Sequence, residues 1–170
     1  MKQARGVILA GGQARRMGGG DKGRLMVQGR SLLEHARARL EPQVEALAPN
    51  ANGDPARFDD LGLPVIADSI AGCAGARAGV LAGLDWAAEK GADLLVAAAA
   101  DSPFFPCDLV PRLLQAGEGM THPLVLAASP DPERARNRHP TFGLWPVALR
   151  DDLRAALEGG LRKVVLWTDQ

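Results

Sequence analysis

The residues best suited to chemistry lie in a glycine-rich, basic segment that follows the apolar run of residues 7–10. This segment, residues 9–22, reads LAGGQARRMGGGDK. Glycines let backbone N–H groups approach an anion closely, and they accept positive φ angles without strain. Arg15, Arg16 and Lys22 add fixed positive charge, and an arginine can hold phosphate oxygens through two parallel hydrogen bonds. A buried strand that runs into such a loop predicts a phosphate-binding site.

The loop departs from the two common phosphate-binding templates. It contains no G-x-x-x-x-G-K-[ST] sequence, which argues against an ordinary P-loop. Residues 18–23 match G-x-G-x-x-G, but they start well after the expected strand end instead of at a strand–helix junction, which leaves little support for a dinucleotide-dependent oxidoreductase. The alternative interpretation is a surface loop that is merely rich in glycine and arginine. Loop position, glycine content and charge together favour the phosphate site.

Strand-like and helix-like patterns alternate along the chain, which predicts a three-layer α/β fold: a mostly parallel sheet with helices on both faces. Strands are expected at residues 6–10, 44–48, 64–67, 93–100, 123–128 and 142–145, with a short extended piece at 24–27; helices are expected at 31–40, 76–88, 106–116 and 147–157, followed by a further segment at 161–168. Ser31 and Glu34 form a capping box at the start of the first helix. Residues 129–137, dense in proline and charge, are expected to form a flexible loop.

Small or polar residues follow the carboxyl ends of four expected strands, namely Gly11, Asn50, Asp68 and Asp101. Ligands of such sheets bind beyond the carboxyl ends of the strands, so these four residues are predicted to meet at one site. Asp101 is the candidate ligand for Mg²⁺, which binds proteins through one or two carboxylates and completes its shell with substrate phosphates and water. The alternative for Asp101 is a carboxylate that only caps the following segment.

The composition excludes several classes of function. Twenty basic side chains balance twenty acidic ones among 170 residues, whereas a nucleic-acid-binding protein usually carries a basic excess. No apolar stretch is long enough to span a bilayer, and the first expected strand starts too early to leave room for a signal peptide. We therefore expect one cytoplasmic domain, residues 1–170, with no nucleic-acid or membrane partner. Cys73 and Cys107 are expected to be small buried hydrophobes, and Trp86 and Trp145 to be core residues.

Several motifs of the chain match one known family. The pattern L-A-G-G-x-x-x-R-M-G-G-x-D-K of residues 9–22 resembles the signature loop of the molybdenum cofactor guanylyltransferases, which belong to a wider family of nucleotidyltransferases. Further matches are N-A-N at 50–52, I-A-D-S at 66–69, A-D-S-P at 100–103 and H-P-T-F-G-L-W at 139–145. The resemblance implies a Rossmann-like nucleotidyltransferase fold. It also implies transfer of GMP from GTP to a molybdopterin-type acceptor, with Mg²⁺ as cofactor and release of pyrophosphate.

The resemblance also implies roles for individual residues. Those expected to bind the nucleotide are Leu9, Ala10, Gly11, Gly12, Lys22, Asn50, Asp68 and Asp101. Three of the expected roles are catalytic: Lys22 neutralises phosphate charge in the transition state, Arg16 holds the leaving pyrophosphate, and Asp101 carries the metal. Glycine at position 11, which makes the motif L-A-G-G and not L-A-A-G, implies GTP in preference to CTP.

The acceptor side is implied by residues 139–145, where we expect a structural or pterin-facing role for His139. Arg134, Arg136 and Arg138 could attract the phosphate of the acceptor, although a charged loop is usually only solvated. Partner enzymes that deliver or accept the cofactor are also implied.

The chain departs from the family pattern at three points. Residues 75–79 read G-A-R-A-G where the family usually has G-P-L-A-G, and Ala100 stands where many relatives have cysteine. The chain stops at Gln170, whereas relatives continue to an N-x-N-T-P-E-D segment, so we expect the domain to lack the family's C-terminal segment. Two other functions stay open on the sequence: a cytidylyl- or sugar-nucleotidyltransferase, and a non-catalytic nucleotide-binding module.

Overall fold

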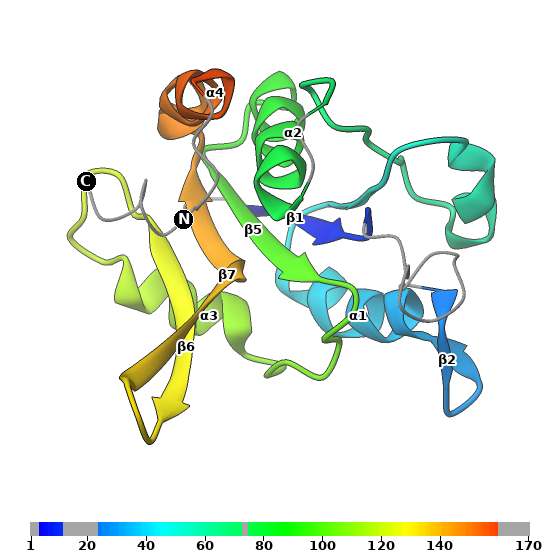
Figure 1. Cartoon of the computed structure of the whole chain (residues 1–170), viewed down its shortest axis with the longest axis horizontal. Helices are drawn as coiled ribbons and strands as arrows, with labels where there is room; N and C mark the ends of the chain where they lie inside the picture. Colours follow the sequence, from blue (N-terminus) through cyan, green and yellow to red (C-terminus); the bar gives the residue numbers. More distant parts are fainter. Residues whose placement is uncertain (1–3, 12–23, 73–74, 160–170) are drawn as a thin grey trace.

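The computed structural model describes residues 4–11, 24–72 and 75–159 of the chain. At its centre is a five-stranded sheet in the order β4-β1-β5-β7-β6 (Figure 1). The strands are β1 (Ala4–Leu9), β4 (Leu47–Asn50), β5 (Leu94–Ala99), β6 (Val125–Asp131) and β7 (Ala135–Pro146). β1 pairs in parallel with both β4 and β5, whereas β7 runs antiparallel to β5 and β6 antiparallel to β7. Only β7 is therefore reversed, and the expected mostly parallel sheet is confirmed.

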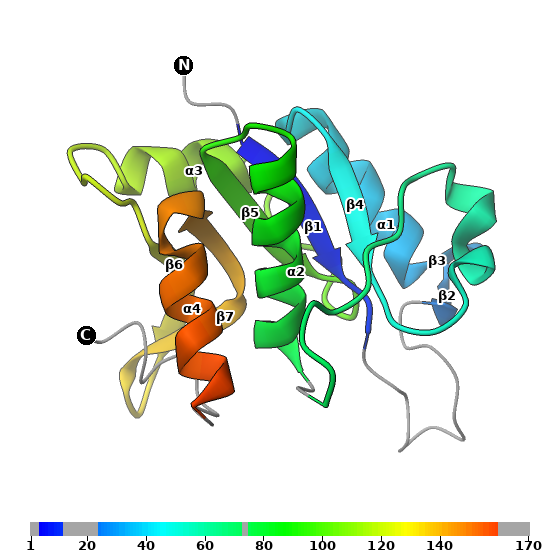
Figure 2. The ribbon, with the colours of Figure 1, turned by 90° about the horizontal axis from the view of Figure 1, so that it is seen from above.

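Helices cover both faces of the sheet, as Figure 2 shows. The helices are α1 (Leu32–Leu40) and α3 (Leu109–Ala116) on one face, and α2 (Ala76–Glu89) and α4 (Arg150–Glu158) on the other. Successive side chains of a strand point to opposite faces, so Ile8 of β1 packs in the cluster of α1 and α3 and Val7 in that of α2 and α4. The predicted three-layer α/β architecture is confirmed.

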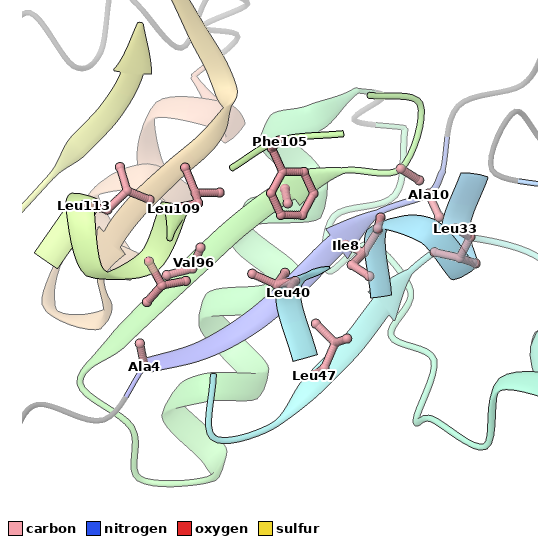
Figure 3. Close-up of a cluster of buried hydrophobic side chains, with 14 of the residues drawn as sticks. Ala4, Ile8, Ala10, Leu33, Leu40, Leu47, Val96, Phe105, Leu109 and Leu113 are labelled. Atoms are coloured by element: carbon pink, nitrogen blue, oxygen red, sulfur yellow. The ribbon is translucent and has the colours of Figure 1, made fainter. Parts of the chain in front are cut away.

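The larger hydrophobic cluster lies between the sheet and the helices α1 and α3 (Figure 3). Ile8 and Val96 enter it from the sheet, and Leu40 and Leu109 enter it from the helices. Every residue of β5 is buried, which is the pattern of a strand covered on both faces and agrees with its uninterrupted apolar run. The strand that leads to Asp101 is therefore held rigidly in the middle of the sheet.

Shorter elements complete the described structure. These are the 3₁₀ helices η3 (Glu41–Gln43), η4 (Pro55–Leu61) and η5 (Val147–Leu149), and a two-stranded hairpin of β2 (Met26–Val27) and β3 (Arg30–Ser31). The predicted capping box is confirmed, because Ser31 Oγ accepts the Glu34 N–H at 3.2 Å while the Ser31 N–H donates to Glu34 Oε2 at 2.7 Å. None of the helices in the described residues is long and apolar enough to cross a membrane.

The prediction of a flexible loop at residues 129–137 is wrong. These residues belong to a hairpin formed by the end of β6 and the start of β7. Asp131 organises its turn, since Oδ1 accepts the backbone N–H groups of Glu133 at 2.8 Å and Arg134 at 2.9 Å. Pro130 is compatible with this strand because β6 lies at the edge of the sheet, where proline is tolerated.

Three smaller expectations also need correction. The strand expected at 64–67 is reduced to a single parallel bridge between Asn50 and Ile66. The helix expected from residue 106 begins at Leu109, because residues 106–109 first form a turn in which the carbonyl of residue 106 accepts the Leu109 N–H at 3.1 Å. Cys107 is exposed and not buried. Trp86 and Trp145 are buried as expected, while Cys73 and residues 161–168 lie outside the described residues.

Candidate nucleotide site

Backbone hydrogen bonds hold the ends of β1, β4 and β5 level at one edge of the sheet. The Ala10 N–H donates to the carbonyl of Asn50 at 2.9 Å, and the Ala100 N–H donates to the carbonyl of Leu9 at 3.1 Å. Gly11 and Asp101 are each the next residue along the chain, so they leave the sheet from adjacent strands at the same edge. The convergence predicted from strand ends is confirmed for these residues.

A network of amide and carboxylate groups lies at this edge. Asn50, only 4% exposed, donates through Nδ2 to Asp68 Oδ1 at 3.0 Å and to the Ile66 carbonyl at 3.1 Å. Asn52 Nδ2 donates to the other oxygen of the same carboxylate at 2.8 Å, and the Asp68 N–H donates back to Asn52 Oδ1 at 2.9 Å. Both carboxylate oxygens are thus held by amides, so this Asn50–Asn52–Asp68 network fixes the end of β4 to the segment beside it.

The first turn of α2 packs directly against Asn50 of this network. A Cβ added to Gly79 would overlap Asn50 Oδ1 and would lie 2.7 Å from Leu9 Cδ2. Glycine is therefore required at position 79 for the helix to approach β1 and β4 this closely. Gly75 is the N-cap of α2, and the amino-terminal end of this helix lies at the same edge as the strand ends (Figure 2). Its partial positive charge favours an anion at this edge.

A second set of polar contacts ties the segment after Asp68 to the helices. The Ser69 hydroxyl donates to Asp85 Oδ2, and Arg154 of α4 donates to both oxygens of Asp85 at 2.7 and 2.8 Å. The hydrogen bond with Asp85 raises the pKa of Arg154 above its ordinary value. These contacts join α4, α2 and the segment that follows Asp68. They therefore limit the movement of Asp68 on the side of the helices.

Asp101 is exposed at the end of β5, and its neighbours fix the backbone that carries it. Pro103 and Phe105 are buried, and Arg39 of α1 donates to the Phe105 carbonyl at 2.6 Å. Within the described residues there is no group of three or more His, Cys, Asp and Glu side chains that could hold a metal ion. One exposed carboxylate is nevertheless a donor set that suits Mg²⁺, because substrate phosphates and water complete its octahedral shell.

The structure brings together six of the residues assigned to the site from the sequence: Leu9, Ala10, Gly11, Asn50, Asp68 and Asp101. Gly12, Arg16 and Lys22, with the rest of the glycine-rich loop, lie outside the described residues. The hydrogen bonds through which Asn52 and Asp85 hold the segment around Asp68 were not predicted from the sequence. The spacing of N-A-N carried a signal for Asn52, since residues two apart along an extended segment can reach one partner, but nothing local marked Asp85.

Comparison with solved structures places this arrangement in the nucleotidyltransferase fold. A 4-diphosphocytidyl-2C-methyl-D-erythritol synthase from Anaerococcus prevotii superposes with a TM-score of 0.74 at 14% identity, covering 96% of this chain and 78% of that one. Molybdopterin-guanine dinucleotide biosynthesis protein A from Archaeoglobus fulgidus superposes with a TM-score of 0.71 at 23% identity, covering 95% and 77%. At these identities the likeness concerns the fold alone.

Sequence comparison is more specific. Residues 6–170 match the family described as the MobA-like NTP transferase domain. A molybdenum cofactor guanylyltransferase of Bradyrhizobium sp. (strain ORS 278) is 52% identical over 166 residues, which are 96% of this chain and 76% of that protein. One from Mesorhizobium japonicum is 50% identical over 150 residues, covering 88% and 70%. The chain belongs to the MobA-like NTP transferase family, and the resemblance to the molybdenum cofactor guanylyltransferases is confirmed.

Proposed function

We propose that this chain transfers GMP from GTP to a molybdenum–molybdopterin acceptor, giving the guanine dinucleotide form of the cofactor and pyrophosphate. The name shared by relatives about half identical to this chain supports the reaction and both substrates. The structural observation that carries the proposal is the meeting of Gly11, the Asn50–Asn52–Asp68 network and Asp101 at one edge of the sheet. Partner enzymes and a cytoplasmic location stay predictions.

The environment of Gly11 supports a purine nucleotide. Its backbone lies outside the left-handed region, and among the described residues a Cβ there would meet Asn50 alone, at 3.8 and 3.9 Å. Neither backbone strain nor packing within the described residues therefore requires glycine at this position. The described residues leave open the space that a methyl group would fill, which agrees with the L-A-G-G motif and with GTP in preference to CTP.

The proposed reaction joins two anions. An oxygen of the acceptor's phosphate forms a new bond to the α-phosphorus of GTP, the bond from that phosphorus to the oxygen bridging to the β-phosphate breaks, and pyrophosphate leaves with the electron pair. The nucleophile is already ionised and needs no strong general base. Catalysis therefore depends on positioning and on compensating negative charge. In this proposal Arg16 and Lys22 supply that compensation, and the Asn50–Asn52–Asp68 network with Ala10 and Gly11 positions the nucleotide.

We assign the Mg²⁺ of this proposal to Asp101. When bound, the ion would neutralise charge on the phosphate oxygens beside the reacting phosphorus. The exposed Asp101 carboxylate lies on the turn after β5. In the sheet, β5 lies between β1, which leads to Gly11, and β7. Among the described residues, the ligand that we assign to the ion is thus the single carboxylate of Asp101.

Single-turnover release of pyrophosphate from GTP and the acceptor tests the function. Asp101→Ala should abolish Mg²⁺-dependent release and leave the melting temperature unchanged. Asp93→Ala is a matched control, because Asp93 is also exposed but lies just before the other end of β5. Near-normal turnover of Asp101→Ala would remove Asp101 from the metal role. Tight GTP binding by the wild-type chain without pyrophosphate release would identify a nucleotide-binding module, and preferential use of CTP would indicate a cytidylyltransferase.

A further inference from the structure

Asn52 belongs to a bend that joins β4 to the 3₁₀ helix η4. Gly53 in this bend has a φ of +87°, a conformation that residues other than glycine rarely adopt. Asp54 is the N-cap of η4, because its Oδ1 accepts the Ala56 N–H at 2.9 Å. From this bend the side chain of Asn52 contributes two hydrogen bonds to the Asn50–Asn52–Asp68 network. The position of the bend therefore decides whether the Asn52 amide reaches Asp68.

One guanidinium group holds the two carbonyls on either side of Gly53. Arg57 of η4 donates through Nη2 to the Asn52 carbonyl at 2.5 Å and through Nε to the Asp54 carbonyl at 3.2 Å. A Cβ added to Gly53 would lie 3.8 Å from Arg57 Nη2, so the guanidinium lies close against the bend. These contacts fix the backbone from which the Asn52 amide extends.

Arg57 is itself held by its neighbours in η4 and by an arginine from another part of the chain. Its guanidinium lies 5.0 Å from the ring centre of Phe58, which is 1% exposed. Its backbone carbonyl accepts a hydrogen bond from Arg24 Nη2 at 2.9 Å. Arg24 also donates to both carboxylate oxygens of Asp60, at 2.8 and 3.1 Å. This hydrogen bonding lowers the pKa of Asp60 below its ordinary value, so the pair consists of two charged groups at neutral pH.

The contacts form a continuous series from Arg24 to Asp68. The series passes through the carbonyl of Arg57 and then through Asn52, whose amide contacts Asp68. Figure 2 shows η4 next to the hairpin of β2 and β3, on the β4 side of the sheet. An exposed ion pair such as Arg24–Asp60 contributes little to stability by itself, so we expect its effect on the geometry of the site and not on the folded state.

We propose that Arg57 is a positioning residue of the nucleotide site, which holds Asn52 so that its amide keeps both contacts with Asp68, and that the Arg24–Asp60 pair holds Arg57 in turn. This inference rests on the proposed function, because it concerns the network that binds GTP in that proposal. An exposed asparagine side chain loses rotamer freedom when it makes two directed hydrogen bonds. A backbone that is already fixed lowers this cost, which is the general advantage of preorganisation for binding.

The test measures the Kd for GTP by titration calorimetry in Arg57→Ala, with and without Asn52→Ala in the same chain. Arg57→Ala should weaken GTP binding about tenfold, the loss expected when one hydrogen bond is no longer held in place. In the Asn52→Ala background the amide is absent, so Arg57→Ala should change the Kd by less than about twofold. A residue that only stabilises the fold would lower the urea midpoint and leave the Kd unchanged in both backgrounds.

Arg57→Lys and Asp60→Asn, measured in the same two backgrounds, carry the test if Arg57→Ala does not fold. Lysine keeps the charge but lacks the planar set of donors that reaches two carbonyls, so Arg57→Lys should give an intermediate Kd. Asp60→Asn removes the charge that holds Arg24 and should weaken GTP binding about two- to threefold. Asp108→Asn is the matched control, because it breaks an exposed pair with Arg112 at the start of α3 and should leave the Kd unchanged.

The outcomes separate this inference from the function on which it rests. If the Kd values follow the expected pattern but the wild-type chain releases no pyrophosphate with the acceptor, the inference stands and the proposed reaction is wrong. If Asn52→Ala or Arg57→Ala binds GTP as tightly as the wild type, the inference is wrong. An equal loss of affinity from Arg57→Ala in both backgrounds would also overturn it, because Arg57 would then act on the nucleotide without Asn52.

Discussion

Gly79→Ala should weaken GTP binding by displacing one side chain. The new Cβ would overlap Asn50 Oδ1 and lie 2.7 Å from Leu9 Cδ2, so the Asn50 amide has to move. Asn50 is 4% exposed and bonded to both Asp68 and Ile66, so it cannot move without losing those bonds. A hydrogen bond to a charged group is worth about 1.5–3 kcal/mol. If GTP binding depends on the geometry that this bond maintains, affinity should fall by about ten- to a hundredfold.

The same substitution should also lower global stability. Overpacking of a core site costs about 1–3 kcal/mol, while alanine in place of glycine inside a helix returns about 1 kcal/mol. Loss of the Asn50–Asp68 hydrogen bond adds about 1.5–3 kcal/mol. We therefore expect the free energy of unfolding of Gly79→Ala to fall by about 1.5–5 kcal/mol, measured by urea denaturation. GTP affinity is measured by titration calorimetry on the folded protein, so the two effects are read separately.

Gly83→Ala is the matched control in the next turn of α2. Its Cβ would lie 2.8 Å from Leu95 Cδ2 and 3.0 Å from Val7 Cγ1, so it overpacks the same helix against the same sheet without reaching Asn50. It should lose about 0–2 kcal/mol of stability, because no hydrogen bond is broken, and bind GTP like the wild type. Equal GTP affinity in Gly79→Ala, Gly83→Ala and the wild type would refute the argument that the Asn50–Asn52–Asp68 network positions the nucleotide.

Two further predictions concern Gly11 in the site and Glu34 in the capping box of α1. Gly11→Ala should leave the melting temperature unchanged, because its Cβ would make only ordinary contacts with Asn50, and should raise the KM for GTP relative to that for CTP; an unchanged ratio in steady-state assays would remove residue 11 from base selection. Hydrogen bonds from the backbone and side chain of Ser31 hold the pKa of Glu34 below its ordinary value, so the ionised carboxylate stabilises the folded state. That stabilisation should be present above about pH 4.5 and be lost as the pH falls through the lowered pKa. In urea denaturation at a series of pH values, Glu34→Gln should show a smaller loss of stability in acid than the wild type. The same acid dependence in both proteins would contradict this prediction.

The parts of the site that could be predicted from the sequence depend on local patterns. The end of an apolar strand locates Gly11 and Asp101, since residues that follow parallel strands meet at one edge whatever the details of packing. The capping box at Ser31 was predictable for the same reason, because both of its hydrogen bonds join residues three apart.

The parts that could not be predicted depend on contacts between distant segments. Asn52 and Asp68 are 16 residues apart in the chain, and Asp85 and Arg154 are 69 apart, so neither pair leaves a periodic signal. The prolines and charges at 129–137 are typical of loops, so the sequence predicts a loop where the structure has a hairpin. Those residues are compatible with a strand only because β6 is at the edge of the sheet, which strand order alone decides.

The reversed direction of β7 lets paired strands continue past the edge of the sheet at which β1 and β5 end. A parallel strand ends at the site edge, and whatever follows it has to be a loop, as after β1 and β5. An antiparallel strand arrives from that side, so β7 and its partner β6 can extend beyond the edge as a paired hairpin, with one register shift between Leu126 and Ala127. On the β1 and β4 side of this edge, the chain is held by the side-chain amides of Asn50 and Asn52 and by the end of α2. On the β7 and β6 side, it is held by backbone pairing. That backbone pairing holds a hairpin whose residues 132–138 are exposed.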